Sequence, residues 1–382
     1  MLPELNEGGV EIGTLQLSNY LSTHGHTSIV ISAGGRLVPQ IEKNGGSHIC
    51  YPVGKKSFRC LQCIHPIRRL LVQRKVDILH LDSRLPAWIG YLAAKSLPRN
   101  IRPRILTTFH GFHSVNRYSA IMTKGDTVVA VSKTVKDHIV REYHIPEDRI
   151  RVIYRGIDQE KFKPESVSIQ QIRHLKSQWN IDNASAPIIL LPARLSRLKG
   201  HETFIRSLAL IKEFPWTVIC AGAFNPSSSR FVKIQNLISQ LGLQHRVEFV
   251  GHCDDMACAL MIADIVVSAS IEPEGFGLTM VEAQALGKPV IATAHGGSLE
   301  TVFDGQNGWL VEPGNYHHMA SALKEAILNQ EKRIEFGKEG RKFVNRHFSI
   351  QKMCEDTLEL YPSTMRLNEL DLNNSFNHRH DA

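Results

Sequence analysis

Short runs of β-branched and other apolar residues alternate with segments of helical periodicity along most of the chain. Alternation of this kind is typical of parallel βαβ units. The sequence therefore predicts an α/β fold built on parallel sheets. The predicted strands are Thr27–Ser32, Asp77–Leu81, Arg104–Phe109, Thr127–Val131, Arg151–Tyr154, Ile188–Leu191, Thr217–Ala221, Val247–Val250, Ile265–Ser268, Pro289–Ala292 and Gly308–Val311.

The strands form two series, separated by the polar, strand-poor stretch Asp158–Ala186. We place a domain boundary near residue 160, which gives an N-terminal domain over 1–160 and a C-terminal domain over 161–349. Two domains also suit a chain of 382 residues. Ile169–Trp179 has the periodicity of a helix, whereas the polar tail 363–382 is predicted to be disordered.

The first strand of the first series is predicted to be largely missing. The Gly8-Gly9 turn and the helix after it should follow a buried strand, yet only Met1–Leu5 precede them. The first strand of a doubly wound sheet is central. We therefore expect the chain to begin late, inside this strand, and to leave apolar neighbours and ladder groups exposed.

The composition is that of an ordinary globular protein. Hydrophobic residues make up 42% of the chain and charged residues 21%, which excludes a disordered or fibrous chain. The formal net charge of +8 suits a phosphate-bearing ligand, nucleic acid or an anionic membrane face without choosing among them. No apolar run approaches the roughly 18 residues of a membrane-spanning helix, and the N-terminus lacks a signal-peptide pattern. We expect a cytoplasmic protein.

The cysteines predict neither disulfides nor a metal site. An odd number scattered over a long chain argues against a secreted disulfide framework and indicates a reducing compartment. Cys60 and Cys63 have the spacing of a zinc site, but no second pair follows at finger distance. The cysteines are Cys50, Cys60, Cys63, Cys220, Cys253, Cys258 and Cys354.

The densest chemical signal is Ser270–Ala283, directly after a predicted strand. Gly275 and Gly277 allow backbone amides to approach a ligand at the start of a helix, where anions are favoured. Glu274 lies in the turn and Glu282 about two helical turns further on. The two carboxylates can therefore accept hydrogen bonds from two hydroxyl-bearing parts of one extended ligand. A helix cap and a solvated side chain are the alternatives.

A second cluster, Pro192–Gly200, also follows an apolar strand and leads into a helix. Arg194 can offer a diphosphate a planar fork, and Lys199 a point charge. Loop cations are often merely solvated. Both clusters end strands of the same series, however, and ligands of open α/β sheets bind at the carboxyl ends of strands. Together the two clusters favour a binding site over solvated loops.

Two features of the first half carry weaker signals. Gly8-Gly9 precedes a helix and can present backbone amides, although a glycine pair is more often a plain turn. His110 follows the strand Arg104–Phe109, where it can bind a sugar hydroxyl; a purely structural histidine is the alternative.

A basic segment runs from Lys55 to Arg104, with apolar residues interleaved and few acidic ones, Asp77 and Asp82. It can contact an anionic membrane surface or hold a phosphorylated acceptor. No nucleic-acid partner is predicted, because no finger, helix-turn-helix or aromatic-bearing sheet motif accompanies the segment. A solvated face is the alternative. The basic residues are Lys55, Lys56, Arg59, Arg68, Arg69, Arg74, Lys75, Arg84, Lys95, Arg99, Arg102 and Arg104.

Several of these segments together resemble the retaining, nucleotide-sugar-dependent glycosyltransferases of family 4. The resemblance rests on Glu274 to Ala292, on Arg194 with Lys199-Gly200, on Val152–Asp158 and on Gly8–Glu11. It implies the GT-B fold: two Rossmann-like domains facing a cleft, the first binding the acceptor and the second the nucleotide sugar, with the helix 350–362 packing back on the first.

A weaker resemblance, through Gly9–Thr14, Ala33–Pro39 and Arg155–Asp158, is to bacterial lipopolysaccharide core mannosyltransferases. It implies mannosyl transfer from GDP-mannose to a lipopolysaccharide core or related glycolipid acceptor, with retention, without a metal or cofactor, and at the inner face of the cell membrane. A family 4 enzyme using a UDP-sugar, glucose or N-acetylglucosamine, for another cell-envelope glycan is the alternative.

The family resemblance also implies roles for individual residues. Arg194 and Lys199 hold the donor diphosphate, and Glu274 contacts the hydroxyls of the transferred sugar. His110 lies beside this sugar. Retention is usually explained in the family by front-face displacement, in which no protein nucleophile takes part.

The remaining implied positions bind the donor. Glu282 holds the ribose hydroxyls, and the nucleobase lies near Gly251 and His252. Backbone amides complete the site, from Gly8, Gly9, Gly275, Phe276, Gly277 and Leu278.

Two hypotheses outside this family are alternatives. A doubly wound NAD-dependent oxidoreductase is disfavoured because Gly8-Gly9 lacks the further glycine spacing and no acidic residue convincingly ends a second strand. A non-enzymatic protein that binds an anionic partner through its basic face predicts no nucleotide affinity and a steep salt dependence.

Overall fold

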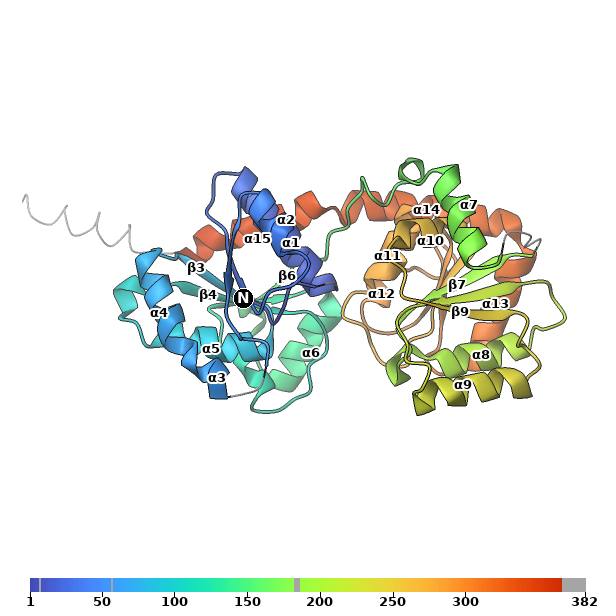
Figure 1. The fold of residues 1–382 in the computed structure, drawn as a ribbon, viewed down its shortest axis with the longest axis horizontal. Coiled ribbons are helices and arrows are strands. Elements are labelled where there is room, and N and C mark those ends of the chain that lie inside the picture. Colours follow the sequence, from blue (N-terminus) through green and yellow to red (C-terminus); the bar gives the residue numbers. More distant parts are fainter. Residues whose placement is uncertain (7, 56–57, 182–185, 366–382) are drawn as a thin grey trace, which may run out of the picture. The chain divides into compact units, whose positions relative to one another are not determined.

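The computed structural model describes residues 1–6, 8–55, 58–181 and 186–365. The chain divides into two compact units, each an α/β structure (Figure 1). The first unit comprises Met1–Tyr154 and the C-terminal helix from Gln351, and the second comprises Arg155–Ile350.

The division falls a few residues before the predicted boundary near residue 160. The backbone after Tyr154 already packs within the second unit, because the amide of Ile157 donates to the carbonyl of Phe348 at 2.8 Å. Gly156 lies so close to Ile350 that a side chain at this position would collide with its backbone.

The first unit holds a two-stranded and a four-stranded parallel sheet. Each strand that the sequence predicts here is present within a residue or two. One strand, β2, was not predicted, because it is short, polar and only half-buried. The strands are β1 (Ile29–Ser32) and β2 (Ser47–Cys50), then β3 (Ile78–Leu81), β4 (Arg104–Phe109), β5 (Thr127–Ala130) and β6 (Ile150–Val152), paired in this order.

Residues Met1–Leu5 fill the space between the two sheets. On one side the amide of Leu2 donates to Ile31, and on the other the amide of Asp82 donates to the carbonyl of Met1. Leu2 and Leu5 are completely buried. The expectation of exposed apolar neighbours is therefore wrong: the short segment supplies the central strand's backbone contacts and its apolar side chains.

Two groups of helices cover the first unit. α1 (Gly9–Thr23) contacts α2 (Val38–Lys43), and α15 (Ile350–Met365) lies beside them (Figure 1). The second group comprises α3 (Phe58–Gln62), α4 (Ile64–Gln73), α5 (Arg84–Lys95) and α6 (Lys133–Tyr143). α15 extends to Met365, three residues into the predicted disordered tail, whose remainder, 366–382, lies outside the described residues.

The second unit contains a six-stranded parallel sheet in the order β12-β11-β10-β7-β8-β9. The chain runs outward from β7 in one direction and from β10 in the other, so the strand order reverses between these two neighbours. All six strands were predicted. They are β7 (Ile188–Pro192), β8 (Thr217–Ala221), β9 (Val247–Gly251), β10 (Ile265–Ser268), β11 (Val290–Thr293) and β12 (Trp309–Val311).

Helices cover both faces of this sheet. α8 (His201–Ala209), α9 (Ser229–Gln240) and α13 (Tyr316–Leu328) pack together on one face. The other helices are α7 (Ile169–Gln178), which matches the predicted helix 169–179, α10 (Met256–Ile262), α11 (Leu278–Ala285), α12 (Ser298–Thr301) and α14 (Gln330–His347).

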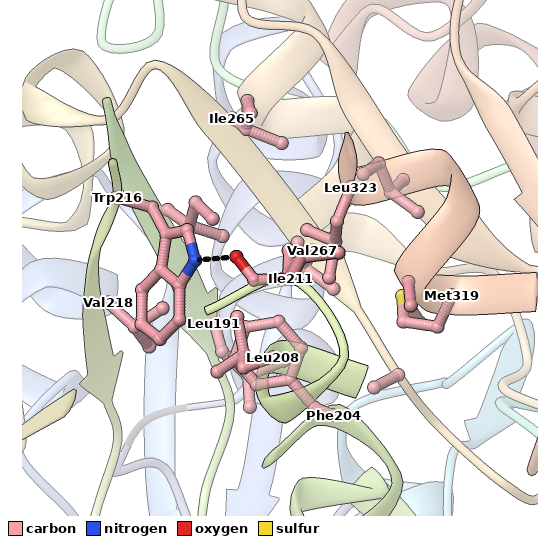
Figure 2. Close-up of a cluster of buried hydrophobic side chains, with 14 of the residues drawn as sticks. Leu191, Phe204, Leu208, Ile211, Trp216, Val218, Ile265, Val267, Met319 and Leu323 are labelled. Atoms are coloured by element: carbon pink, nitrogen blue, oxygen red, sulfur yellow. Dashed lines mark hydrogen bonds between the residues drawn. The ribbon is translucent and has the colours of Figure 1, made fainter. Parts of the chain in front are cut away.

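The core of the second unit fixes the strands that carry the candidate site. Phe204 and Leu208 of α8 pack against β7 residues such as Leu191 (Figure 2). Trp216 is 2% exposed, and its indole Nε1 donates to the carbonyl of Ile211 at 2.9 Å, which satisfies the one polar atom of this ring. Burial of several large side chains, each worth about 1.5–3 kcal/mol, holds β7 against its helices.

No helix in the described ranges is long and apolar enough to cross a membrane.

Candidate active site

The point where the strand order reverses brings two loops together. β7 and β10 are neighbours, with Val266 paired to Leu190. The loop after β7 carries Lys199, and the loop after β10 carries Glu274. Ligands of open α/β sheets bind at such a reversal, outside the carboxyl ends of the strands.

Lys199 and Glu274 form an ion pair, with Nζ and Oε1 2.8 Å apart and both side chains about 70% buried (30% and 26% exposed). The hydroxyl of Ser270 donates to the same Oε1, and that of Ser268 approaches it at 3.4 Å. Burial alone would raise the pKa of the Glu274 carboxyl, but the charge and hydrogen bond of Lys199 and the two hydroxyls lower it below its usual range. Glu274 is therefore an ionised acceptor, not the helix cap of the alternative interpretation.

Two glycines allow the loops to approach each other and a ligand. Gly200 has φ +64°, and a side chain there would collide with the carbonyl of Ala269. Gly277, at φ +81°, precedes α11 without a side-chain cap. In the part of the chain that the structure describes, nothing accepts a hydrogen bond from the amides of Leu278 and Thr279. These amides, with the helix dipole, suit an anion.

Lys199, Glu274 and the start of α11 line a small cavity of about 20 Å³. Its lining joins both loops to the start of α11, so it brings together three elements that the sequence placed at one site. The polar lining residues include Lys199, Ser268, Ser270, Glu274 and Thr279.

A third loop, after β11, supports the Glu274 turn and was not predicted. His295 Nε2 lies 2.9 Å from the carbonyl of Ser270, and the amide of Gly297 donates to the carbonyl of Glu274 at 2.8 Å. Gly296, at φ +56°, would place a side chain against the backbone of Glu274. The sequence signal was available: a Gly-Gly pair at 296–297, a few residues after a predicted strand.

Arg194 lies on the loop that follows β7, Gly251 is the last residue of β9, and His252 follows it. Arg194 is exposed and makes no ion pair within the described ranges. The carbonyl of Gly251 accepts from the amide of Gly222, which joins the ends of β8 and β9, and His252 is half-exposed beside Asp254. Phe276 is buried against Phe348, so this residue can offer a ligand only its backbone.

Glu282 lies inside α11, and only part of the residue reaches solvent. Burial raises the pKa of its carboxyl to about 7, with the charge of Lys161 opposing the shift. Since Glu282 is only partly exposed, it is not the fully solvated face residue of the alternative interpretation. Its predicted contact with ribose hydroxyls stays a prediction.

The shift of Glu282 predicts how stability depends on pH. Because the folded pKa lies above the unfolded value, the stabilising contribution is complete below about pH 4.3 and is lost as pH rises through 7. The variant E282Q cannot ionise. We expect it to match the wild type at pH 4 and to exceed it at pH 8, by at most about 4 kcal/mol. Urea unfolding at both pH values measures this difference; parallel pH dependence in the two proteins would contradict it.

His110, Gly8 and Gly9 belong to the first unit. His110 follows β4, as predicted, and its Nε2 lies 3.2 Å from Oδ1 of Asp82, a contact that the sequence did not reveal. Gly8 is the residue before α1, at φ +137°, with no side-chain cap, and Gly9 begins the helix. The predicted functions of these three residues stay predictions.

Part of the basic segment is structural. Arg102 donates to the carbonyls of Lys95 and Leu97 at the end of α5, and Arg104 pairs with Asp126. On α4, in contrast, Arg69 is exposed, while the same helix buries Ile67. Lys56 lies outside the described residues.

Family models match both units. Residues 7–161 match the model described as Glycosyltransferase Family 4, and residues 173–343 match Glycosyl transferases group 1. The chain is a family 4 glycosyltransferase. The two parallel-sheet units are its GT-B fold.

Individual proteins agree with this assignment. A solved glycosyltransferase from Rickettsia africae ESF-5 is 34% identical, with a TM-score of 0.86 over 96% of this chain and 97% of its own. The N-acetyl-alpha-D-glucosaminyl L-malate synthase of Bacillus anthracis is 25% identical over 95% of this chain and 96% of its own. Anabaena Alr3699/HepE, solved in complex with UDP-glucose, shares the fold of this glycosyltransferase at 22% identity, with a TM-score of 0.79 over 94% and 97% of the two chains.

Proposed function

We propose that this glycosyltransferase moves mannose from GDP-mannose onto a lipopolysaccharide core or related glycolipid, with retention of configuration and without a metal ion or cofactor. The observation that carries the donor site is the Lys199–Glu274 pair beside the start of α11, at the reversal of the strand order. A cation, a carboxylate and the first turn of α11 line one small cavity, which supports this assignment.

Each group has a role in this proposal. Lys199 and the exposed Arg194 hold the diphosphate, together with the amides at the start of α11. Glu274 accepts hydrogen bonds from the hydroxyls of the transferred sugar, and Glu282 accepts those of the ribose. The nucleobase lies at Gly251 and His252. Positioning and stabilisation of the departing diphosphate supply the rate enhancement, since preorganised charges of this kind are worth several kcal/mol.

The environment of Glu274 suits a mechanism without a protein nucleophile. Its Oε1 is already occupied by Lys199 and Ser270, so this carboxylate orients a ligand more readily than it attacks one. In the proposed reaction the acceptor hydroxyl enters on the face from which the diphosphate leaves. The bond from the sugar's anomeric carbon to the phosphate oxygen breaks as the bond to the acceptor oxygen forms, and a phosphate oxygen takes the acceptor's proton.

The surface of α3 and α4 supports a glycolipid acceptor and peripheral attachment to the inner face of the cell membrane. Leu61 and Val72 are 49% and 42% exposed, and Arg69, Arg74 and Lys75 are exposed close to them in the chain. No acidic residue lies between Lys55 and Lys75. Exposed apolar and cationic side chains together favour an anionic lipid surface.

The second candidate is transfer from a UDP-sugar to another cell-envelope glycan. It is favoured by the UDP-glucose bound to Anabaena HepE and by the N-acetylglucosaminyl transfer that names the Bacillus anthracis relative. The two candidates share the diphosphate and ribose contacts and differ in the nucleobase and sugar.

Nucleotide selectivity distinguishes the candidates. We expect GDP, in the presence of EDTA, to raise the melting temperature of the protein more than UDP, ADP or NAD, because a ligand at about 100 times its Kd stabilises the native state by about 2.7 kcal/mol. Selective stabilisation by UDP would favour the second candidate, transfer from a UDP-sugar, over transfer from GDP-mannose. Stabilisation by NAD alone, or by no nucleotide, would contradict the proposed donor site.

A further inference from the structure

The carboxyl ends of β3 and β4 hold a carboxylate between two histidines. Asp82 follows β3, and His110 follows β4, its neighbour in parallel register. Oδ1 of Asp82 lies 3.2 Å from Nε2 of His110 and 3.5 Å from Nε2 of His80. His80 Nε2 has a closer partner, Thr108 Oγ1 at 2.6 Å, so His110 is the principal partner of this oxygen.

The charge state of Asp82 determines which atom of His110 carries a proton. The carboxylate is 12% exposed. Burial alone would raise its pKa, but the charge of His80, the hydrogen bond from His110 and the amino group of Met1 lower it far below the usual range. An ionised carboxylate only accepts hydrogen bonds, so Nε2 of His110 must be the protonated nitrogen. In the neutral ring, Nδ1 is then an acceptor.

The contacts of Asp82 differ from those of carboxylates that serve the fold. Asp126 and Asp264 each accept a backbone amide at 2.8 Å, from Ile105 and Ile188, and so cap a strand. Asp82 accepts from no backbone amide within the described residues; its polar neighbours there are His80, His110 and the amino group of Met1. Burial raises the pKa of the Tyr361 hydroxyl, and the charge of the nearby Asp82 adds to this shift.

We propose that Asp82 is a positioning residue for His110: its carboxylate fixes the ring plane of His110 and the tautomer protonated at Nε2. The inference rests on the proposed sugar transfer and on the position beside the transferred sugar that the family resemblance implies for His110. A carboxylate that holds a functional histidine in one tautomer acts on the transition state through that ring and makes no contact with the substrate itself.

The tautomer is tested directly, without turnover. In ¹⁵N-histidine-labelled protein at neutral pH, the resonances that disappear in H110Q belong to His110. We expect them to show Nε2 protonated in the wild type and in the control D126N, and an altered pattern in D82N. A wild-type ring with its single proton on Nδ1, or an unchanged His110 pattern in a folded D82N, would overturn the proposal. If D82N does not fold, the wild-type spectrum decides.

A double-mutant cycle tests the consequence for catalysis. Donor turnover is measured with GDP-mannose, and with UDP-glucose in parallel, for D82N, H110A and the double variant, with melting curves for each. We expect D82N to lower kcat by about 10- to 100-fold with little change in KM, and to cause no further loss in the H110A background. D126N is expected to keep its activity.

The outcomes separate the inference from the function on which it rests. Wild-type activity in H110A would show that transfer does not need His110. It would not change the result on the tautomer. Wild-type activity in D82N, with H110A inactive, would overturn the positioning role. Additive losses in the double variant would also overturn it, since they would mean that Asp82 acts independently of His110. If neither donor is turned over, the ¹⁵N-histidine spectrum alone tests whether Asp82 fixes the tautomer of His110.

Discussion

K199A is expected to lower kcat for sugar transfer by about 10²- to 10³-fold. Lys199 is the cation beside Glu274 and the start of α11, where charge develops on the departing diphosphate in the proposed reaction. Removal of one preorganised group that stabilises such charge typically costs about 3–4 kcal/mol in the transition state. The measurement is the steady-state release of nucleotide from GDP-mannose, and from UDP-glucose in parallel.

A second ion pair in the same loops provides a matched control. Arg197 and Glu272 are 2.9 Å apart, two residues before Lys199 and Glu274 in each loop, but their side chains are 71% and 50% exposed. An exposed pair contributes little, so R197A should keep near-wild-type turnover and melting temperature. A folded K199A that retains more than half of the wild-type kcat would contradict the assignment of Lys199.

E274Q is expected to separate transfer from nucleotide binding. The amide keeps the size of the side chain but loses the charge that, in the proposed site, orients the sugar hydroxyls, so kcat should fall by about 10²-fold or more. Loss of this carboxylate also frees Lys199 from its partner and removes a negative charge near the diphosphate. Affinity for GDP or UDP should therefore be unchanged or higher, as measured by calorimetry.

The control for this variant is E272Q, which removes the exposed carboxylate of the neighbouring pair and should leave both quantities unchanged. If E274Q weakened nucleotide binding and transfer to the same degree, Glu274 would serve the binding of the nucleotide and not the sugar. Full transfer activity in E274Q would show that Glu274 is not part of the active site.

Most of the fold could be predicted because buried parallel strands have a clear sequence pattern. Strands covered on both faces need continuous apolar, β-branched runs, and β7, β8 and β10 have them. β2 lacks this signal because Ser47 and Cys50 at its two ends are exposed. Met1–Leu5 are too short for a strand signal, and their role depends on backbone contacts with both neighbouring sheets.

The site could be predicted in part, for a different reason. Lys199 and Glu274 are far apart in the chain, but each follows a strand of the same series, and the ends of parallel strands share one edge. What the sequence does not contain is their direct ion pair, or the environment that raises the pKa of Glu282 to about 7. Both depend on which strands are neighbours and on how closely α11 is packed.

The contacts that were missed are made by side chains from adjacent strands or loops. In the sequence, Asp82 is only one of two acidic residues in a basic segment, whereas the register of β3 and β4 places it against His110. His295 reaches the carbonyl of Ser270 because β10 and β11 are paired. Pairing and register are tertiary information, which periodicity alone does not supply.

In the proposed function, this chain transfers a sugar from a nucleotide donor through the Lys199–Glu274 site. The most direct test incubates the protein with GDP-mannose labelled in the mannose and with detergent-solubilised, core-truncated lipopolysaccharide, and counts the label in the lipid fraction; labelled UDP-glucose and the variant E274Q are run beside it. We predict transfer from GDP-mannose by the wild type and about 1% of this rate or less in E274Q. No transfer from either donor, or equal transfer by E274Q, would contradict the account.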